Sequence, residues 1–163
     1  MDGFDPQSLL PLPGHGFMMR QLLATALLVA ASVMIHAFML TWLVQRTRHW
    51  PRLADIGYLK SSWQMIRIAW WILVTHLTEI LVWGWFYVAK GVFPDIAAAT
   101  YFSIVTYTTV GYGDLVATTE WRILAGAEAL TGILMCGWSA ALFFSIVSQR
   151  HSRDTSEGPS RSG

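Results

Sequence analysis

Three long apolar segments constrain this chain more than any other feature of its sequence. They run from Gln21 to Val44, from Ile66 to Ala89 and from Ile123 to Val147. An α-helix rises about 1.5 Å per residue, so about 20 residues cross the hydrocarbon core of a bilayer, and each segment is long enough. Of all residues, 54% are apolar and 13% are charged, a composition typical of membrane proteins. We therefore expect an all-α membrane protein.

The first apolar segment is interpreted as a retained helix rather than a cleaved signal peptide. Its apolar run is longer than that of a signal peptide, and it is followed by Arg46 and Arg48 instead of small residues suited to cleavage. The chain before residue 64 and after residue 149 is assigned to four parts: an extramembrane N-terminal segment (1–17), an extra transmembrane helix (18–45), a basic cytoplasmic linker (46–63) and a disordered cytoplasmic tail (150–163).

A fourth apolar stretch, Ile96 to Tyr107, is too short to span a bilayer. It lies between Pro94-Asp95, which favours a helix start, and a glycine-containing strip. Non-helical backbone at membrane depth is tolerated only where protein or a water-filled cavity surrounds it. The stretch is therefore predicted to be a re-entrant helix, and the residues after it are expected to face a pore or a protein interior.

The distribution of Lys and Arg predicts the orientation in the membrane, because cytoplasmic loops carry an excess of these residues. Eight lie after the first segment, at the start of the second or in the tail: Arg46, Arg48, Arg52, Lys60, Arg67, Arg150, Arg153 and Arg161. Three lie on the other side: Arg20, Lys90 and Arg122. The N-terminus is expected outside and the C-terminus in the cytoplasm, with the re-entrant stretch entering from the outer face.

Charge and cysteine content exclude several classes of function. A net charge of +1 without a large basic cluster argues against nucleic acid as a partner, since duplex binding needs many phosphate-neutralising cations. The single cysteine, Cys136, permits no intrachain disulfide and is interpreted as an inert core thiol. No pattern of catalytic residues, cofactor-binding loop or catalytic metal ligands is found, so neither an enzyme nor a cofactor is expected.

The residues after the re-entrant stretch carry a specific motif, Thr106-Tyr107-Thr108-Thr109-Val110-Gly111-Tyr112-Gly113-Asp114. With Tyr101-Phe102 before it and an apolar span after it, the region from Asp95 to Gln149 resembles the pore domain of potassium channels. The likeness is strongest to small bacterial channels of the two-transmembrane type. It implies a pore domain over 64–149, divided into an outer helix (64–90), a pore helix (95–108), a selectivity filter (109–114) and an inner helix (120–149).

The resemblance also implies roles for the motif residues. The backbone carbonyls of Thr109, Val110, Gly111 and Tyr112, with the Thr109 hydroxyl, are expected to bind K⁺ in place of its water shell. Support of this filter falls to Thr108, Gly113 and Asp114. One loop supplies one wall, so a closed ring of carbonyls needs four copies around a fourfold axis. A K⁺-conducting homotetramer in the bacterial inner membrane is expected, with the lipid bilayer as its surroundings. The alternative is a non-channel membrane protein that keeps a non-conducting filter.

The sequence departs from the pattern of this family at two places. Where some bacterial channels carry a Glu in the pore helix that bonds the filter Asp, this chain has Val105, so Asp114 needs another partner. The extra N-terminal helix is not part of the minimal pore, and its role is open.

Three ionisable residues lie within the spans of the pore domain. His76 and Glu79 share one helix face, and Glu128 lies at a comparable depth in the inner helix. Buried ionisable groups in a membrane need partners, so we expect a polar cluster behind the filter, bonding groups such as Ser103, Thr106 or Tyr107. The cluster is either a structural hydrogen bond between His76 and Glu79 or a pH-sensitive element. By contrast, His36 stands alone in the first span and is interpreted as a packing residue.

The inner helix carries two features whose interpretation stays open. Residues expected to line the conduction cavity are Leu134, Gly137, Ala141 and Ser145. The last three form a small-residue stripe that could instead serve close helix packing. Gly132 and Gly137 either bend the helix or allow packing, and Trp138 is expected to pack against a neighbouring subunit.

Overall fold

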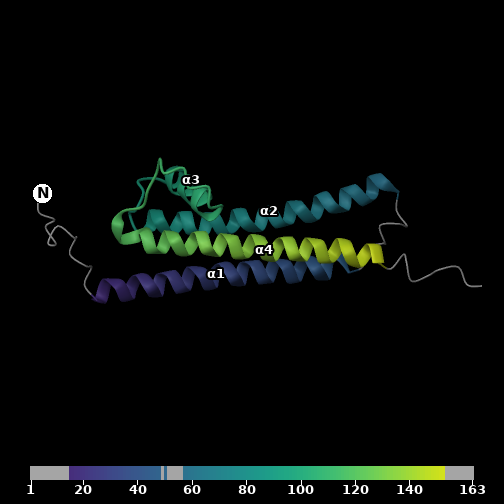
Figure 1. Cartoon of the computed structure of the whole chain (residues 1–163), viewed down its shortest axis with the longest axis horizontal. Coiled ribbons are helices and arrows are strands. Elements are labelled where there is room, and N and C mark those ends of the chain that lie inside the picture. Colours follow the sequence, from purple (N-terminus) through teal and green to yellow (C-terminus); the bar gives the residue numbers. More distant parts are fainter. Residues whose placement is uncertain (1–14, 49, 51–56, 153–163) are drawn as a thin grey trace, which may run out of the picture.

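The computed structural model describes residues 15–48, 50 and 57–152. Within these residues the chain is all-helical: α1 (His15–Thr47), α2 (Tyr58–Ala89), α3 (Ile96–Tyr107), the short 3₁₀ helix η2 (Thr119–Trp121) and α4 (Arg122–Ser152). The three long helices run side by side, each in contact with the other two, and α3 lies beside one end of α2 (Figure 1). The filter segment connects α3 to η2 at that same end of the bundle.

Three of these helices are long and apolar enough to cross a membrane, and α3 is a shorter apolar helix, which confirms the predicted set of elements. The observed helix bounds differ from the predicted ones at the basic linker (46–63). The α1 helix ends at Thr47 and α2 begins at Tyr58, so both helices extend into the predicted linker. No Gly or Pro interrupts the residues from Tyr58 to Gln64, so the second helix continues past the membrane-spanning length. The predicted N-terminal segment and C-terminal tail lie almost entirely outside the described residues.

Several polar side chains of α1 face inward, and large apolar side chains lie on its opposite face. Gln21, Ser32 and His36 are buried, whereas the side chains of Leu27 and Phe38 are 71% and 72% exposed. The Trp83 indole on α2 donates a hydrogen bond to the Ser32 hydroxyl over 3.0 Å, and the Gln21 amide donates to the Glu120 carbonyl. This pattern suits a helix with lipid on one side and protein on the other.

A side-chain cap starts α3, and aromatic packing holds α3 against α2. The Asp95 carboxylate accepts a 2.8 Å hydrogen bond from the backbone N–H of Ala98, as an N-cap residue does. The ring centroid of Phe102 lies 5.2 Å from that of Tyr87 and 4.8 Å from that of Phe93, within the range of favourable aromatic pairs. The cap fixes the start of α3, and the aromatic contacts fix its middle to the end of α2.

The C-terminal end of α3 approaches α4 at Gly132, where only a glycine fits. A Cβ built on Gly132 would lie 1.9 Å from the carbonyl oxygen of Tyr107, whereas a Cβ on Gly137 would meet nothing within 4 Å in the chain. Of the two roles considered for Gly132, the structure favours close packing over bending. This contact sets how near the filter lies to the inner helix.

Replacing Gly132 by alanine is expected to destabilise the fold, because the backbone of α3 must shift away from α4. Overpacking of this kind costs about 1–3 kcal/mol, against a gain in helix propensity of up to about 1 kcal/mol. The Gly137→Ala variant is the matched control, since it gains the propensity without the clash. Thermal unfolding in detergent should show a lower midpoint for Gly132→Ala than for both wild type and Gly137→Ala; equal midpoints would contradict the close contact.

Candidate ion-conducting site

The filter backbone adopts an alternating conformation. Thr109, Gly111 and Gly113 have φ angles of 60°, 59° and 78°, all in the left-handed region, while Val110 and Tyr112 between them do not. Glycine enters this region at little cost, but a threonine rarely does. Such outliers cluster at functional sites, where the surrounding structure holds them in place. Glycine thus occupies two of the three left-handed positions, and Thr109 is the exception.

Hydrogen bonds join the start of the filter segment to the last turn of α3. The N–H of Thr109 donates to the Thr106 carbonyl over 2.9 Å, and the N–H of Gly111 donates to the Val105 carbonyl over 3.2 Å. The Thr108 hydroxyl donates to the Ile104 carbonyl over 2.6 Å. Carbonyls that a helix end leaves without intrahelical partners are here used to hold the segment that follows.

Asp114, at the outer end of the filter, finds its partner in Tyr101. The Tyr101 hydroxyl on α3 donates a 2.6 Å hydrogen bond to one carboxylate oxygen, and the N–H of Leu115 donates to the other over 3.0 Å. Donation by the Tyr101 hydroxyl lowers the pKa of Asp114 below its usual value. Tyr101 therefore supplies the support that Val105 cannot give. Arg122 forms no ion pair with Asp114 among the described residues.

A first cluster of polar side chains, the Glu79 cluster, joins all four helices behind the filter. One Glu79 carboxylate oxygen lies 2.8 Å from Nδ1 of His36, and the other accepts a hydrogen bond from the Tyr107 hydroxyl. That hydroxyl also lies 3.0 Å from Nδ1 of His76. Ser139 lies 3.1 Å and 3.2 Å from Nε2 of His36 and His76, respectively. The five side chains form a closed ring, and one of them, Tyr107, lies two residues before Thr109 in the sequence.

A second cluster, the Glu128 cluster, supports the middle of α3. One Glu128 carboxylate oxygen accepts a 2.7 Å hydrogen bond from the Tyr87 hydroxyl, and the other accepts one from the Ser103 hydroxyl. The Ser103 oxygen also lies 3.0 Å from the Ile80 carbonyl. Glu128 and Ser103 are completely buried. The Glu128 cluster thus links α4, α3 and α2.

The structure places His76 and Glu79 together, as partners of one tyrosine hydroxyl, and puts Glu128 in a separate cluster. It also adds His36, which sequence reasoning set aside because it stands alone in its helix. The residue is fully buried and paired with Glu79. A signal was available, since Gln21, Ser32 and His36 are separated by 11 and 4 residues and so fall on one helix face.

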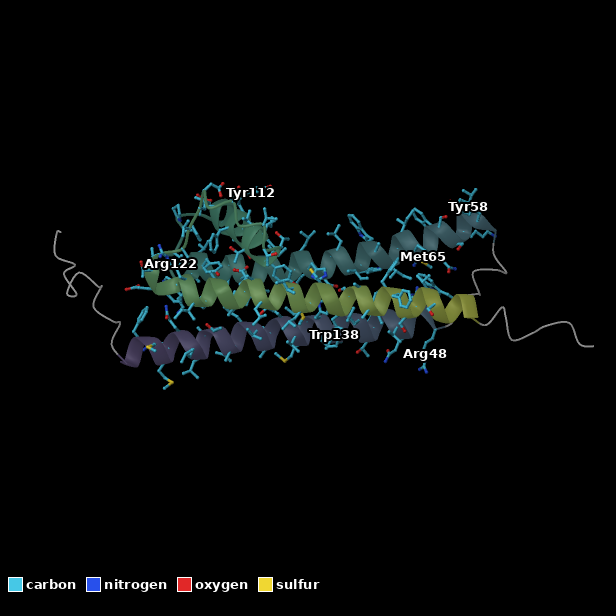
Figure 2. The ribbon with its side chains drawn as sticks, in the orientation of Figure 1. Arg48, Tyr58, Met65, Tyr112, Arg122 and Trp138 are labelled. Atoms are coloured by element: carbon cyan, nitrogen blue, oxygen red, sulfur yellow. The ribbon has the colours of Figure 1, made fainter. Side chains whose placement is uncertain are left out.

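The proposed cavity residues on α4 lie on a side that the chain itself leaves largely uncovered. Leu134 is 57% exposed, Gly137 and Ala141 are exposed, and Ser145 is half-buried. Cavity lining and close packing between subunits both remain compatible with this placement. One interpretation changes, because Cys136 is exposed rather than a core thiol. The Trp138 ring lies 5.6 Å from the His36 ring of its own chain, toward α1 (Figure 2), but the residue is 44% exposed, so its contact with a neighbouring subunit stays a prediction.

The fold is that of a multi-pass membrane protein with three candidate spans, in which a short apolar helix and a loop lie between the second and the third. Residues 75–149 match the family model described as "Ion channel", which covers the second half of α2, all of α3, the filter and most of α4. This part of the chain is therefore similar to an ion channel domain. No curated protein and no solved structure matches the chain.

Replacing Tyr101 by phenylalanine should return the pKa of Asp114 toward its ordinary value. A lowered pKa stabilises the fold, and this stabilisation is fully present above the pKa of an unfolded Asp, about 3.9. The variant should therefore be less stable than wild type at pH 7. The difference should close as the pH falls through the lowered pKa of wild-type Asp114. Unfolding midpoints measured from pH 7 to pH 3 test this.

The control for this experiment is the same change in an Asp114→Asn background. There the effect of Tyr101→Phe should no longer depend on pH, because no carboxylate is left to titrate. A pH dependence that persists in that background would place its origin elsewhere.

Proposed function

We propose that this chain is one subunit of a potassium-selective channel that conducts K⁺ passively as a homotetramer. The observation that carries the proposal is the alternating left-handed backbone at Thr109, Gly111 and Gly113 directly after α3. Alternation of backbone handedness lets successive carbonyls point to one side of an extended segment. Rows of carbonyls on one side are what replaces the water shell of K⁺.

The position of α3 favours a cation at the inner end of the filter. This helix ends at Tyr107, next to the first filter residue, and the C-terminal end of a helix carries partial negative charge. The Glu79 cluster and the Asp114–Tyr101 bond hold the two ends of the segment. A filter held at both ends keeps its carbonyls at fixed distances, which supports discrimination between ions of different size.

The tetramer is supported by what one chain leaves uncovered. The Val110 and Tyr112 side chains are 52% and 73% exposed, which is unusual for large apolar groups outside an interface or a lipid-facing surface. A groove of about 390 Å³ behind the filter, partly lined by Gly111, Gly113 and Arg122, also stands open. Neighbouring subunits around a fourfold axis would cover these surfaces and close the ring of carbonyls.

The orientation proposed for the channel puts the filter at the outer face. Figure 2 places Tyr112 and Arg122 at one end of the bundle and Arg48 and Tyr58 at the other. The second end is the basic one, with Arg46, Arg48, Lys60 and Arg67, and the cytoplasmic side attracts such residues. The N-terminus would then be outside and the C-terminus in the cytoplasm.

Protein reconstituted in lipid vesicles should pass K⁺ and Rb⁺ and reject Na⁺ and Li⁺, with block by barium. A Gly111→Ala variant should lose selective flux, because a side chain at a φ of +59° costs about 1–2 kcal/mol per chain and displaces the carbonyls. Tracer flux and bilayer recording measure both effects.

Gly57→Ala is the matched control, because Gly57 has a φ of −50° and open space for a Cβ. Its flux should equal that of wild type. Equal K⁺ and Na⁺ permeability in wild type would reject potassium selectivity, and the absence of any flux from folded protein would favour the non-channel alternative.

Tags at Asp2 and Gly163, both outside the described residues, should be accessible from opposite sides of the membrane. The N-terminal tag should be labelled by an impermeant reagent on intact spheroplasts and the C-terminal tag only after lysis. Labelling of both tags from the same side would mean that α1 does not span the bilayer.

A further inference from the structure

Glu79 is a fully buried carboxylate that forms no ion pair with a lysine or arginine among the described residues. In the part of the chain that the structure describes, the recorded ion pair joins Glu79 to His36, both with 0% exposed side chains. A carboxylate within a membrane-spanning helix is expensive unless its charge is balanced. The balancing charge here must come from a proton or from another cation within the Glu79 cluster.

The ring nitrogens of the two histidines face two different partners. Nδ1 of His36 faces Glu79 and Nδ1 of His76 faces the Tyr107 hydroxyl, whereas both Nε2 atoms face Ser139. A hydroxyl oxygen has two lone pairs and can accept from both Nε2–H groups. With the protons placed there, the Nδ1 lone pair of His36 faces the Glu79 carboxylate and that of His76 faces the Tyr107 hydroxyl, so both are free to bind an ion between these groups. Histidines that ligate metals are held in this way, by a hydrogen bond at the nitrogen that does not bind the ion.

We propose that His36, His76 and Glu79 bind a divalent transition-metal ion of the Zn²⁺ type. One ligand atom from each residue lies within 4.8 Å of the others. Ligand atoms around tetrahedral zinc are about 3.3 Å apart, so small side-chain rotations complete the set. The Tyr107 hydroxyl already bonds Glu79 and faces His76, so its oxygen can serve as the fourth ligand.

The donor set selects the class of ion. Two imidazoles and one carboxylate suit Zn²⁺ and its transition-metal neighbours, whereas Mg²⁺ and Ca²⁺ prefer oxygen ligands alone. The site is also distinct from the filter, whose donors are backbone carbonyls. An ion in this place would join α1, which contributes His36, to α2 and to the last turn of α3. The extra helix would thereby gain a bond to the pore domain that hydrogen bonds alone do not provide.

Titration of tag-free, metal-stripped, full-length protein in detergent with Co²⁺ tests the proposal. We expect the visible absorption of tetrahedral Co²⁺ to saturate at about one ion per chain. Zn²⁺ should abolish the absorption by displacement, and a large excess of Mg²⁺ should not. X-ray absorption at the zinc edge of the wild-type protein should count two imidazoles per ion and needs no variant.

Variants then assign the ligands. His36→Gln and Glu79→Gln should lose Co²⁺ binding, and Ser139→Ala should weaken it about 10- to 100-fold, as loss of a bond to a metal ligand does. Glu128→Gln, which alters the other buried carboxylate, should bind as wild type does. Circular dichroism and gel filtration check that each variant is folded.

Two results would overturn the proposal. If wild-type protein shows no Co²⁺ or Zn²⁺ binding, the Glu79 cluster is a hydrogen-bonded ring only. If folded His36→Gln binds Co²⁺ as tightly as wild type, or if the zinc edge does not show two imidazoles, the ion sits elsewhere in the chain. Neither result bears on K⁺ conduction, because no filter residue is a ligand.

Discussion

A carboxylate inside a bilayer is tolerated only where the protein itself satisfies it, and Glu79 meets this condition by joining helices that are far apart in sequence. Its two oxygens bond His36 on α1 and Tyr107 on α3, and Ser139 on α4 completes the ring through the imidazoles. Glu128 repeats the principle nearer the outer end, with Tyr87 and Ser103. In a membrane, where apolar packing gains little over lipid contact, these buried polar bonds determine how the four helices are arranged.

Sequence alone predicted the elements that depend on length and composition. Three apolar runs of spanning length predict three helices, and the structure contains them. Pro94-Asp95 predicts the start of the short helix, and Asp95 does cap it. Such signals are local, so each can be evaluated within one stretch of sequence. The similarity to ion channels belongs to the same category, because the motif that carries the resemblance lies within a single loop.

Contacts between distant segments were not predicted in the same way. The partner of Asp114 depends on how the filter folds back along α3, and this path brings Tyr101 within 2.6 Å although 13 residues separate the two. The constraint on Gly132 arises from the carbonyl of Tyr107 on another helix. His36 was misread for a related reason: its partners lie on two other helices, α2 and α4, and an isolated histidine in an apolar run gives no indication of them. Only the spacing of Gln21, Ser32 and His36 marks the inward face of α1.

The inward polar face of α1 has a mechanical consequence. Lipid tails contact the opposite face, where side chains such as Leu27 and Phe38 are exposed, and a helix adjusts its tilt when the thickness of the bilayer changes. Because His36 bonds Glu79 and Glu79 bonds Tyr107, tilting of α1 strains a hydrogen bond that ends two residues from Thr109. Membrane tension and lipid chain length are thus connected to the filter through three side chains.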